Sequence, residues 1–262
     1  MTKLISTTND LLFDIEDGIA IIKLNRPDRM NAVNNNIRNN IISLLSACDA
    51  SNDVRAVVLA GEGGRALSSG QDLEELALIG LDGVAEWQGS QKLLLDSFRK
   101  FSKPCVTAVE GVCVGLGFHM ALCTDWRVAP ESSTWGQPEV KVGLASIVGP
   151  YLMELHIGRT HNLQLSLMAE LITGKRAFEI GLLTETCEAG TAFGAGIARA
   201  RKLASLPRNA TRLTKERFWK VTQQGFDDAF AAGVEAQVAC FKKGEPQGLI
   251  AAFLEKNQTS NR

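Results

Sequence analysis

This 262-residue sequence lacks the features typical of membrane-spanning, secreted and nucleic-acid-binding proteins. It has no apolar run of the ~18 residues that a membrane-spanning helix needs, and its N-terminus lacks the apolar core of a secretion signal. Lys and Arg total 28 and Asp and Glu 29, so the net charge of −1 provides no general attraction for nucleic acid or a membrane surface. We therefore expect a cytoplasmic protein that binds neither nucleic acid nor membrane.

Recognisable metal, redox and nucleophile motifs are also absent. The six cysteines form no C-x-x-C pair, which is typical of reduced core thiols. His156 and His161 are not arranged as H-E-x-x-H, and Ser68-Ser69-Gly70 is not a G-x-S-x-G turn. We expect no metal and no redox cofactor.

The most informative stretch that is present joins an apolar, β-branched run at residues 106–109 to a helical pattern beginning at Phe118. Three glycines, Gly111, Gly115 and Gly117, stand between them. A dinucleotide fingerprint starting at Gly115 would need Gly or Ala at position 120, which is Met, and there is no G-K-[ST] for a P-loop. The turn instead predicts backbone N–H groups open to a negatively charged oxygen.

A second glycine-containing turn, A-L-S-S-G-Q-D-L at residues 66–73, again follows a strand-like run, at residues 54–60, and precedes a probable helix. Two turns of this kind that each direct one backbone N–H to the same point would form an oxyanion hole. The remaining pattern predicts a hairpin at residues 11–24, a helix with an apolar face, a second helix at about 84–101, and an almost entirely helical segment from Thr160 onward. The apolar face of the first helix consists of Ile37, Ile41, Leu44, Leu45 and Cys48. This order indicates α/β packing, but periodicity alone leaves a doubly wound sheet and a spiral of β-β-α turns both open.

The two turns, with W-G-Q-P-E-V-K-V-G-L at residues 135–144, resemble the crotonase family, also called the enoyl-CoA hydratase/isomerase superfamily. The likeness extends from L-N-R-P-D-R-M-N-A at residues 24–32 to A-A-F-L-E-K at residues 251–256. It implies an α/β crotonase-type spiral over residues 1–200 and a C-terminal helical oligomerisation region over residues 201–262. In the family this region builds trimers, often paired into hexamers, so we expect a homo-oligomer.

The resemblance also implies a site. The thioester carbonyl of an acyl-CoA would accept hydrogen bonds from the backbone amides of Gln71 and Leu116, and coenzyme A would be part of the substrate rather than a cofactor. Substrate and CoA contacts are implied for Arg29, Met30, Ala32, Ser69, Gly70, Asp72, Leu73, Gly115, Phe253 and Lys256. Arg26 and Arg65 are further candidates for the CoA phosphates, although lone arginines are commonly solvated surface charges.

The acid-base groups depart from the family pattern. Hydratases of the family use two glutamates; Glu139 matches one, and His119 stands at the position of the other. Histidine can hold a water and exchange protons near neutral pH, but a histidine in an apolar helix is equally consistent with a core residue. For Glu139 the competing interpretation is a carboxylate in a surface turn. If Glu139 is buried instead, burial would raise its pKa toward the range needed for acid-base catalysis.

The expected function is hydration of a 2-enoyl-CoA thioester in fatty acid metabolism, with Glu139 and His119 as the catalytic pair. An alternative is a Δ3,Δ2-enoyl-CoA isomerase that uses Glu139 alone, because one base suffices to move one proton between two carbons. A non-catalytic acyl-CoA-binding homologue, a thioester hydrolase and a decarboxylase stay open on the same oxyanion hole. Residues 145–152, A-S-I-V-G-P-Y-L, replace the family's usual proline, glycine run and T-Q-R segment, which alters the wall beside the acyl group.

Overall fold

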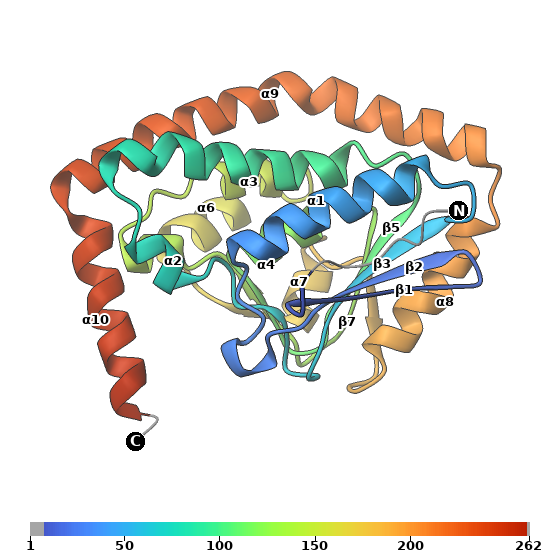
Figure 1. Cartoon of the computed structure of the whole chain (residues 1–262), viewed down its shortest axis with the longest axis horizontal. Coiled ribbons are helices and arrows are strands. Elements are labelled where there is room, and N and C mark those ends of the chain that lie inside the picture. Colours follow the sequence, from blue (N-terminus) through green and yellow to red (C-terminus); the bar gives the residue numbers. More distant parts are fainter. Residues whose placement is uncertain (1–7, 261–262) are drawn as a thin grey trace.

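A computed structural model describes residues 8–260, and only the backbone of residues 257–260 (Figure 1). Its strands are β1 (Leu11–Glu16), β2 (Ile19–Leu24), β3 (Ala56–Gly61), β4 (Ala66–Ser68), β5 (Cys105–Ala108), β6 (Val112–Val114), β7 (Trp126–Pro130), β8 (Thr134–Gly136), β9 (Ile172–Thr173) and β10 (Glu185–Cys187). Its α-helices are α1 (Asn35–Ala50), α2 (Leu73–Ala77), α3 (Val84–Arg99), α4 (Leu116–Leu122), α5 (Val148–Glu154), α6 (Arg159–Met168), α7 (Gly174–Glu179), α8 (Ala192–Ala204), α9 (Arg208–Lys243) and α10 (Glu245–Ser260). Three short 3-10 helices complete the set: η1 (Pro27–Arg29), η2 (Leu81–Gly83) and η3 (Glu139–Val142).

The chain winds as a spiral between two sheets. One sheet has the order β1-β2-β3-β5-β7-β10 and the other β4-β6-β8-β9. Each successive turn gives one strand to each sheet, as β3 and β4, then β5 and β6, then β7 and β8. This topology confirms the predicted spiral of β-β-α turns.

The larger sheet is covered on both faces, which explains the uninterrupted apolar run of β3. Val57 and Leu59 point into the main core together with buried side chains of α1 and α3. The alternate residues Ala56 and Val58 point to the opposite face, where Ala200 of α8 packs. Neither face of β3 therefore needs polar residues.

The structure confirms the predicted hairpin and corrects one prediction. β1 and β2 pair antiparallel around Asp17 and Gly18, both with positive φ. The segment from Thr160 onward is not almost entirely helical, because β9 pairs with β8 and β10 pairs with β7. These strands are two and three residues long, and hydrophobic periodicity cannot reveal strands so short.

The last two helices enclose one end of the spiral. Figure 1 shows α9 passing along the side that carries α3, and α10 turning down beside α2. The turn occurs at Gly244, which adopts the left-handed conformation, and α10 packs on α2 and η3. The division at residue 200 and the oligomerisation role stay predictions. No helix in residues 8–260 is long and apolar enough to span a membrane.

Candidate active site

The two glycine-containing turns meet backbone to backbone. Gly70 and Gly115 both have positive φ, of 102° and 56°. A Cβ on Gly70 would lie 3.3 Å from the amide nitrogen of Leu116, and a Cβ on Gly115 would lie 3.4 Å from the Cα of Gly70. The approach therefore leaves little room for side chains, and glycine satisfies both the conformation and the space.

The amides that directly follow these glycines, those of Gln71 and Leu116, donate no hydrogen bond to any group in residues 8–260. Their neighbours are occupied, because the Ser69 amide donates to the carbonyl of Met30 and the Asp72 amide to that of Val33. Gln71 and Leu116 both line one cavity. Unpaired N–H groups of this kind can donate to a negatively charged oxygen.

Glu139 lies beside these amides at the start of η3. Its Oε1 is 3.5 Å from the Cβ position of Gly115 and 3.6 Å from Nε2 of His119. Only 16% of the Glu139 side chain is exposed, and its Oε2 is buried without a hydrogen-bond partner in the described part of the chain. Burial raises the pKa of this carboxyl above its ordinary value, and the nearby His119 partly offsets that rise.

A directional network orients His119. The Asn162 amide nitrogen donates to the Pro150 carbonyl at 2.7 Å, and a carbonyl can only accept, so the Asn162 oxygen faces Ser166. Ser166 Oγ donates to that oxygen at 3.0 Å and accepts from Gln137 Nε2 at 2.7 Å. The Gln137 Oε1 therefore faces His119 Nε2, at 3.4 Å.

Because Gln137 presents an acceptor to Nε2, this contact favours the His119 tautomer with its proton on that atom. The same Nε2 lies 3.6 Å from Glu139 Oε1, which is close enough for an electrostatic contact but longer than a hydrogen bond.

Gly149, at the start of α5, is required by this network. A Cβ there would lie 1.7 Å from Gln137 Oε1 and 2.6 Å from His119 Nε2, so even alanine would displace both side chains. Its φ is negative, so the need for glycine is one of space alone. The changed segment at residues 145–152 thus leaves room for the His119 and Gln137 side chains.

A cavity of about 640 Å³ brings most of the predicted residues together. Its lining includes Glu139, His119, Gln71, Leu116, Ser69, Gly70, Leu73, Gly115, Phe253 and Lys256. Phe253 and Lys256 lie on α10 of the same chain. The predicted acid-base pair, the amide donors and six of the predicted binding residues thus share one space.

Four predicted binding residues lie beside the cavity without lining it. Asp72 caps α2 and pairs with Arg26 at 2.6 Å, so both charges are engaged in holding the turn. Arg29 pairs with Glu74. The Met30 carbonyl accepts from the Ser69 amide, and the Ala32 carbonyl accepts from Arg26. These groups support the shape of the entrance.

The sequence analysis did not identify the residues that complete the site. Gln137 belongs to the quoted Q-P-E motif, but Ser166 and Asn162 come from α6, far along the chain. No sequence pattern links them, since each is one polar residue in an ordinary helix. The polar wall formed by α3 and α9 was likewise missed.

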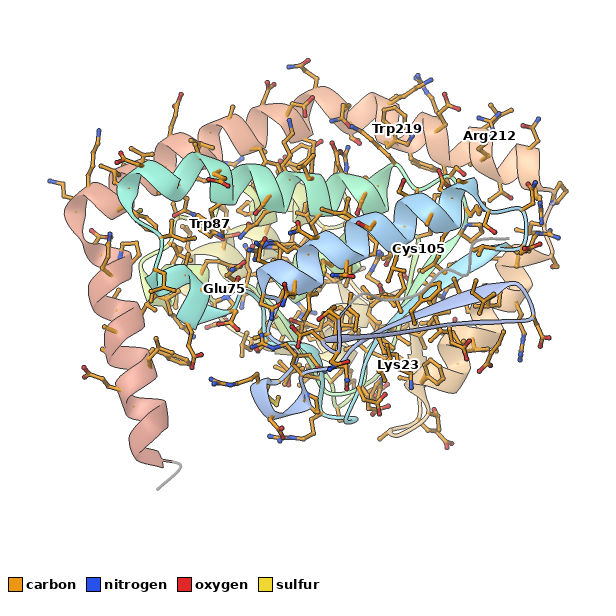
Figure 2. The ribbon with its side chains drawn as sticks, viewed as in Figure 1. Lys23, Glu75, Trp87, Cys105, Arg212 and Trp219 are labelled. Atoms are coloured by element: carbon orange, nitrogen blue, oxygen red, sulfur yellow. The ribbon has the colours of Figure 1, made fainter. Side chains whose placement is uncertain are left out.

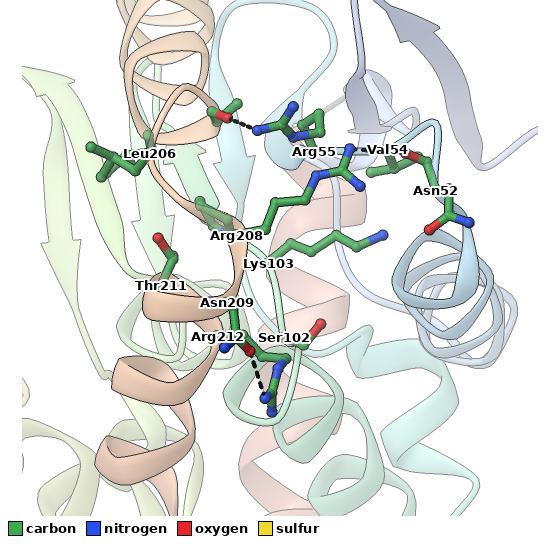
Figure 3. Close-up of a pocket in the computed structure, with 13 residues that line it drawn as sticks. Asn52, Val54, Arg55, Ser102, Lys103, Leu206, Arg208, Asn209, Thr211 and Arg212 are labelled. Carbon is green, nitrogen blue, oxygen red and sulfur yellow. Dashed lines mark hydrogen bonds between the residues drawn. The ribbon is translucent and has the colours of Figure 1, made fainter.

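A second cavity, of about 260 Å³, lies at the start of α9 (Figure 3). Arg55, Lys103 and Arg208 line it, and each donates to backbone carbonyls. The Arg208 bond fastens the start of α9 to the segment after α1, the Arg55 bond reaches the end of α8, and the Lys103 bond joins the segment before β5 to α1. None of the predicted site residues lines this cavity.

Comparison with known proteins agrees with the geometry. Residues 14–261 match the sequence profile of the family described as enoyl-CoA hydratase/isomerase. The chain belongs to the enoyl-CoA hydratase/isomerase family. Within this crotonase superfamily, it is 31% identical to a probable enoyl-CoA hydratase of Rhodobacter capsulatus, over 93% of this chain and 94% of the relative.

Two further family relatives span the same length. A short-chain-enoyl-CoA hydratase of Clostridium acetobutylicum is 26% identical over 95% of this chain and 96% of its own. The crystal structure of an enoyl-CoA hydratase/isomerase from Mycobacterium paratuberculosis superposes with a TM-score of 0.85, at 26% identity, covering 94% of this chain and 98% of that one. Family membership supports an enzyme, and the choice between hydration and isomerisation depends on the chemistry of the site.

Proposed function

We propose that this enzyme adds water to a 2-enoyl-CoA thioester, with Glu139 as the acid-base group. The observation that carries the proposal is the convergence of two unpaired amides, those of Gln71 and Leu116, beside one buried carboxylate. The named hydratase relatives support the same class of substrate.

The amides stabilise the charge that develops on the substrate. When water adds to the β-carbon of an enoyl thioester, the thioester oxygen takes on enolate character. Two N–H donors aimed at that oxygen stabilise it more strongly than they stabilise the neutral carbonyl, and removing one such donor costs ~2.7–4 kcal/mol. The donors are backbone groups, so the side chains of Gln71 and Leu116 are not constrained by this role.

Glu139 moves the proton. Its carboxylate takes a proton from the water as the hydroxyl bonds to the β-carbon, and the carboxylic acid then returns that proton to the α-carbon. One water is added in total and Glu139 ends as it began. His119 Nε2 lies 3.6 Å from Glu139 Oε1, so an N–H there would stabilise the carboxylate electrostatically.

A second candidate is isomerisation of a 3-enoyl-CoA to its 2-enoyl isomer. The orientation of His119 favours it, because the network leaves Glu139 as the single base facing the amides. One carboxylate would take a proton from the α-carbon and deliver it to the γ-carbon. The backbone amides would stabilise the same enolate.

The test is mass spectrometry of the products from crotonyl-CoA in oxygen-18 water and, separately, from a 3-enoyl-CoA. Labelled 3-hydroxyacyl-CoA from the first supports hydration, whereas conversion of the second alone identifies an isomerase. We expect Glu139→Gln to abolish turnover and retain CoA-ester binding, while the matched surface variant Glu179→Gln keeps wild-type rates. Full activity in Glu139→Gln, or no product from either substrate, contradicts the proposal.

A further inference from the structure

Another cavity adjoins the active-site cavity, and the two share one stretch of wall. This side cavity has a volume of about 350 Å³ and lies among α1, α2 and α3. Its lining includes Asn35, Arg38, Glu75, Leu78, Glu86 and Ser90. Within residues 8–260, Gln71 and Trp87 alone line both cavities. These two residues therefore stand between the two spaces.

The head group of Gln71 lies at the boundary itself. Arg38 can only donate, and its Nη1 lies 3.0 Å from Gln71 Oε1. Gln91 Nε2 donates to the same oxygen at 3.3 Å. Arg38 lines the side cavity and Gln91 lines the active-site cavity, so the oxygen is held from both sides. The Gln71 Nε2 atom is buried as well, so the whole amide group fills the wall.

The groups behind Gln71 hold it firmly. Arg38 is 5% exposed, and its guanidinium also pairs with Glu75 at 3.3 Å. Glu75 in turn accepts from the Asn35 amide at 2.9 Å, which anchors the arginine between α1 and α2. A hydrogen bond from a charged donor is stronger than one between neutral groups. Displacing Gln71 would leave a buried guanidinium with fewer partners, which is unfavourable.

Trp87 forms the rest of the boundary from α3. Figure 2 shows Trp87 at the end of α3 nearest α2. The residue is 6% exposed, and its ring lies 6.2 Å from that of Phe241 of α9, measured between ring centroids. Contact with α9 supports the indole on the side away from Gln71. Both parts of the wall are therefore held by neighbouring helices.

This wall stands next to the place where the proposed substrate binds. The Gln71 amide, a proposed donor to the thioester oxygen, and the Gln71 side chain branch from one Cα. A thioester bound at that amide therefore has its first acyl carbons beside the wall. Beyond the wall the side cavity reaches the surface, because Leu78 on its lining is 86% exposed. A small residue at position 71 would join the two spaces and give an acyl chain more room.

We propose that the Gln71 side chain, clamped by Arg38 and Gln91, closes the active-site cavity against the side cavity and so limits the length of the acyl group. This inference rests on the proposed acyl-CoA function. It assigns Gln71 two separate parts, in which the backbone amide binds the thioester oxygen and the side chain sets acyl-chain specificity. It holds for hydration and for isomerisation alike.

Calorimetric binding of saturated straight-chain thioesters tests the inference without turnover. The probes are butanoyl-, hexanoyl-, octanoyl- and decanoyl-CoA. Burial of each further CH₂ raises affinity about fourfold, so affinity rises along the series only while the cavity has room. We expect the wild-type affinity to stop rising within this series. A rise that continues through decanoyl-CoA overturns the inference and leaves the acyl-CoA function standing. If no thioester binds, the acyl-CoA function fails, and this inference fails with it.

Variants assign the limit to the Gln71 side chain. Gln71→Ala opens the wall, so the affinity for decanoyl-CoA relative to butanoyl-CoA should rise roughly tenfold or more, the effect of about two further buried CH₂ groups. Gln71→Met keeps the length of the side chain without its hydrogen bonds and should raise this ratio less. Gln91→Ala removes one of the two clamping bonds and should raise it in the same direction, which provides a second test if Gln71→Ala folds poorly.

The ratio to butanoyl-CoA, measured on each variant, corrects for any general loss of folding or of CoA binding. The matched control Gln224→Ala, on α9 and outside both cavities, should keep the wild-type ratio. A ratio that stays at the wild-type value in both Gln71→Ala and Gln91→Ala overturns the assignment.

Discussion

The network behind His119 makes Ser166→Ala the most informative substitution. Ser166 Oγ accepts from Gln137 at 2.7 Å and donates to Asn162 at 3.0 Å, and all three residues are at least nine-tenths buried. Alanine leaves two buried polar groups unpaired at about 1–3 kcal/mol each, so we expect a loss of roughly 2–6 kcal/mol in unfolding free energy. Ser43→Ala, which removes an exposed bond to the backbone of α1, should change it by less than ~0.5 kcal/mol.

The same variant should alter the tautomer of His119. Without Ser166 to fix it, the Gln137 amide can turn its NH₂ group toward Nε2, which would then accept instead of donate. Long-range ¹H–¹⁵N NMR distinguishes the two tautomers, and the chain has only three histidines to assign. We expect Nε2–H in the wild type and a mixture in Ser166→Ala. A wild-type His119 that carries its proton on Nδ1 alone refutes the directional network and the assignment of Glu139 as the single base.

Three further predictions follow from individual side chains. Gly149→Ala places a Cβ 1.7 Å from Gln137 Oε1 and should lower turnover at least ~100-fold and stability by roughly 1–3 kcal/mol. The control Gly194→Ala, whose Cβ would have no atom within 4 Å, should be neutral or stabilising in urea unfolding. Because burial raises the pKa of Glu139, its carboxylate destabilises the folded state as pH rises above 4.5. Glu139→Gln should therefore be more stable than the wild type at pH 8, and a less stable variant at that pH contradicts the prediction. Burial lowers the pKa of His156 from 6.5 to about 4, so the unfolded state binds more protons between these pH values. About 3 kcal/mol of stability should therefore be lost as pH falls from 6.5 to 4. His156→Gln should reduce this dependence of unfolding free energy on pH in denaturant titrations, and an unchanged dependence would show that other groups cause it.

Local sequence was sufficient for the elements that carry the site. The hairpin at β1 and β2, the buried face of α1 and the two glycine turns depend on residues close together in the chain, where turn chemistry and periodicity act directly. The short strands β9 and β10 could not be predicted, because they form only against edges that the rest of the sheet provides.

The sequence by itself determined the two glycine turns that precede the amides of Gln71 and Leu116, and it supplied the carboxylate of Glu139 that we propose as the base. The tertiary structure decided what His119 does. A histidine can donate or accept at Nε2, and the choice is made here by Gln137, which Ser166 and Asn162 orient from α6. Hydrogen-bond direction and cavity polarity arise from side chains distant in sequence, so only the folded chain can set them.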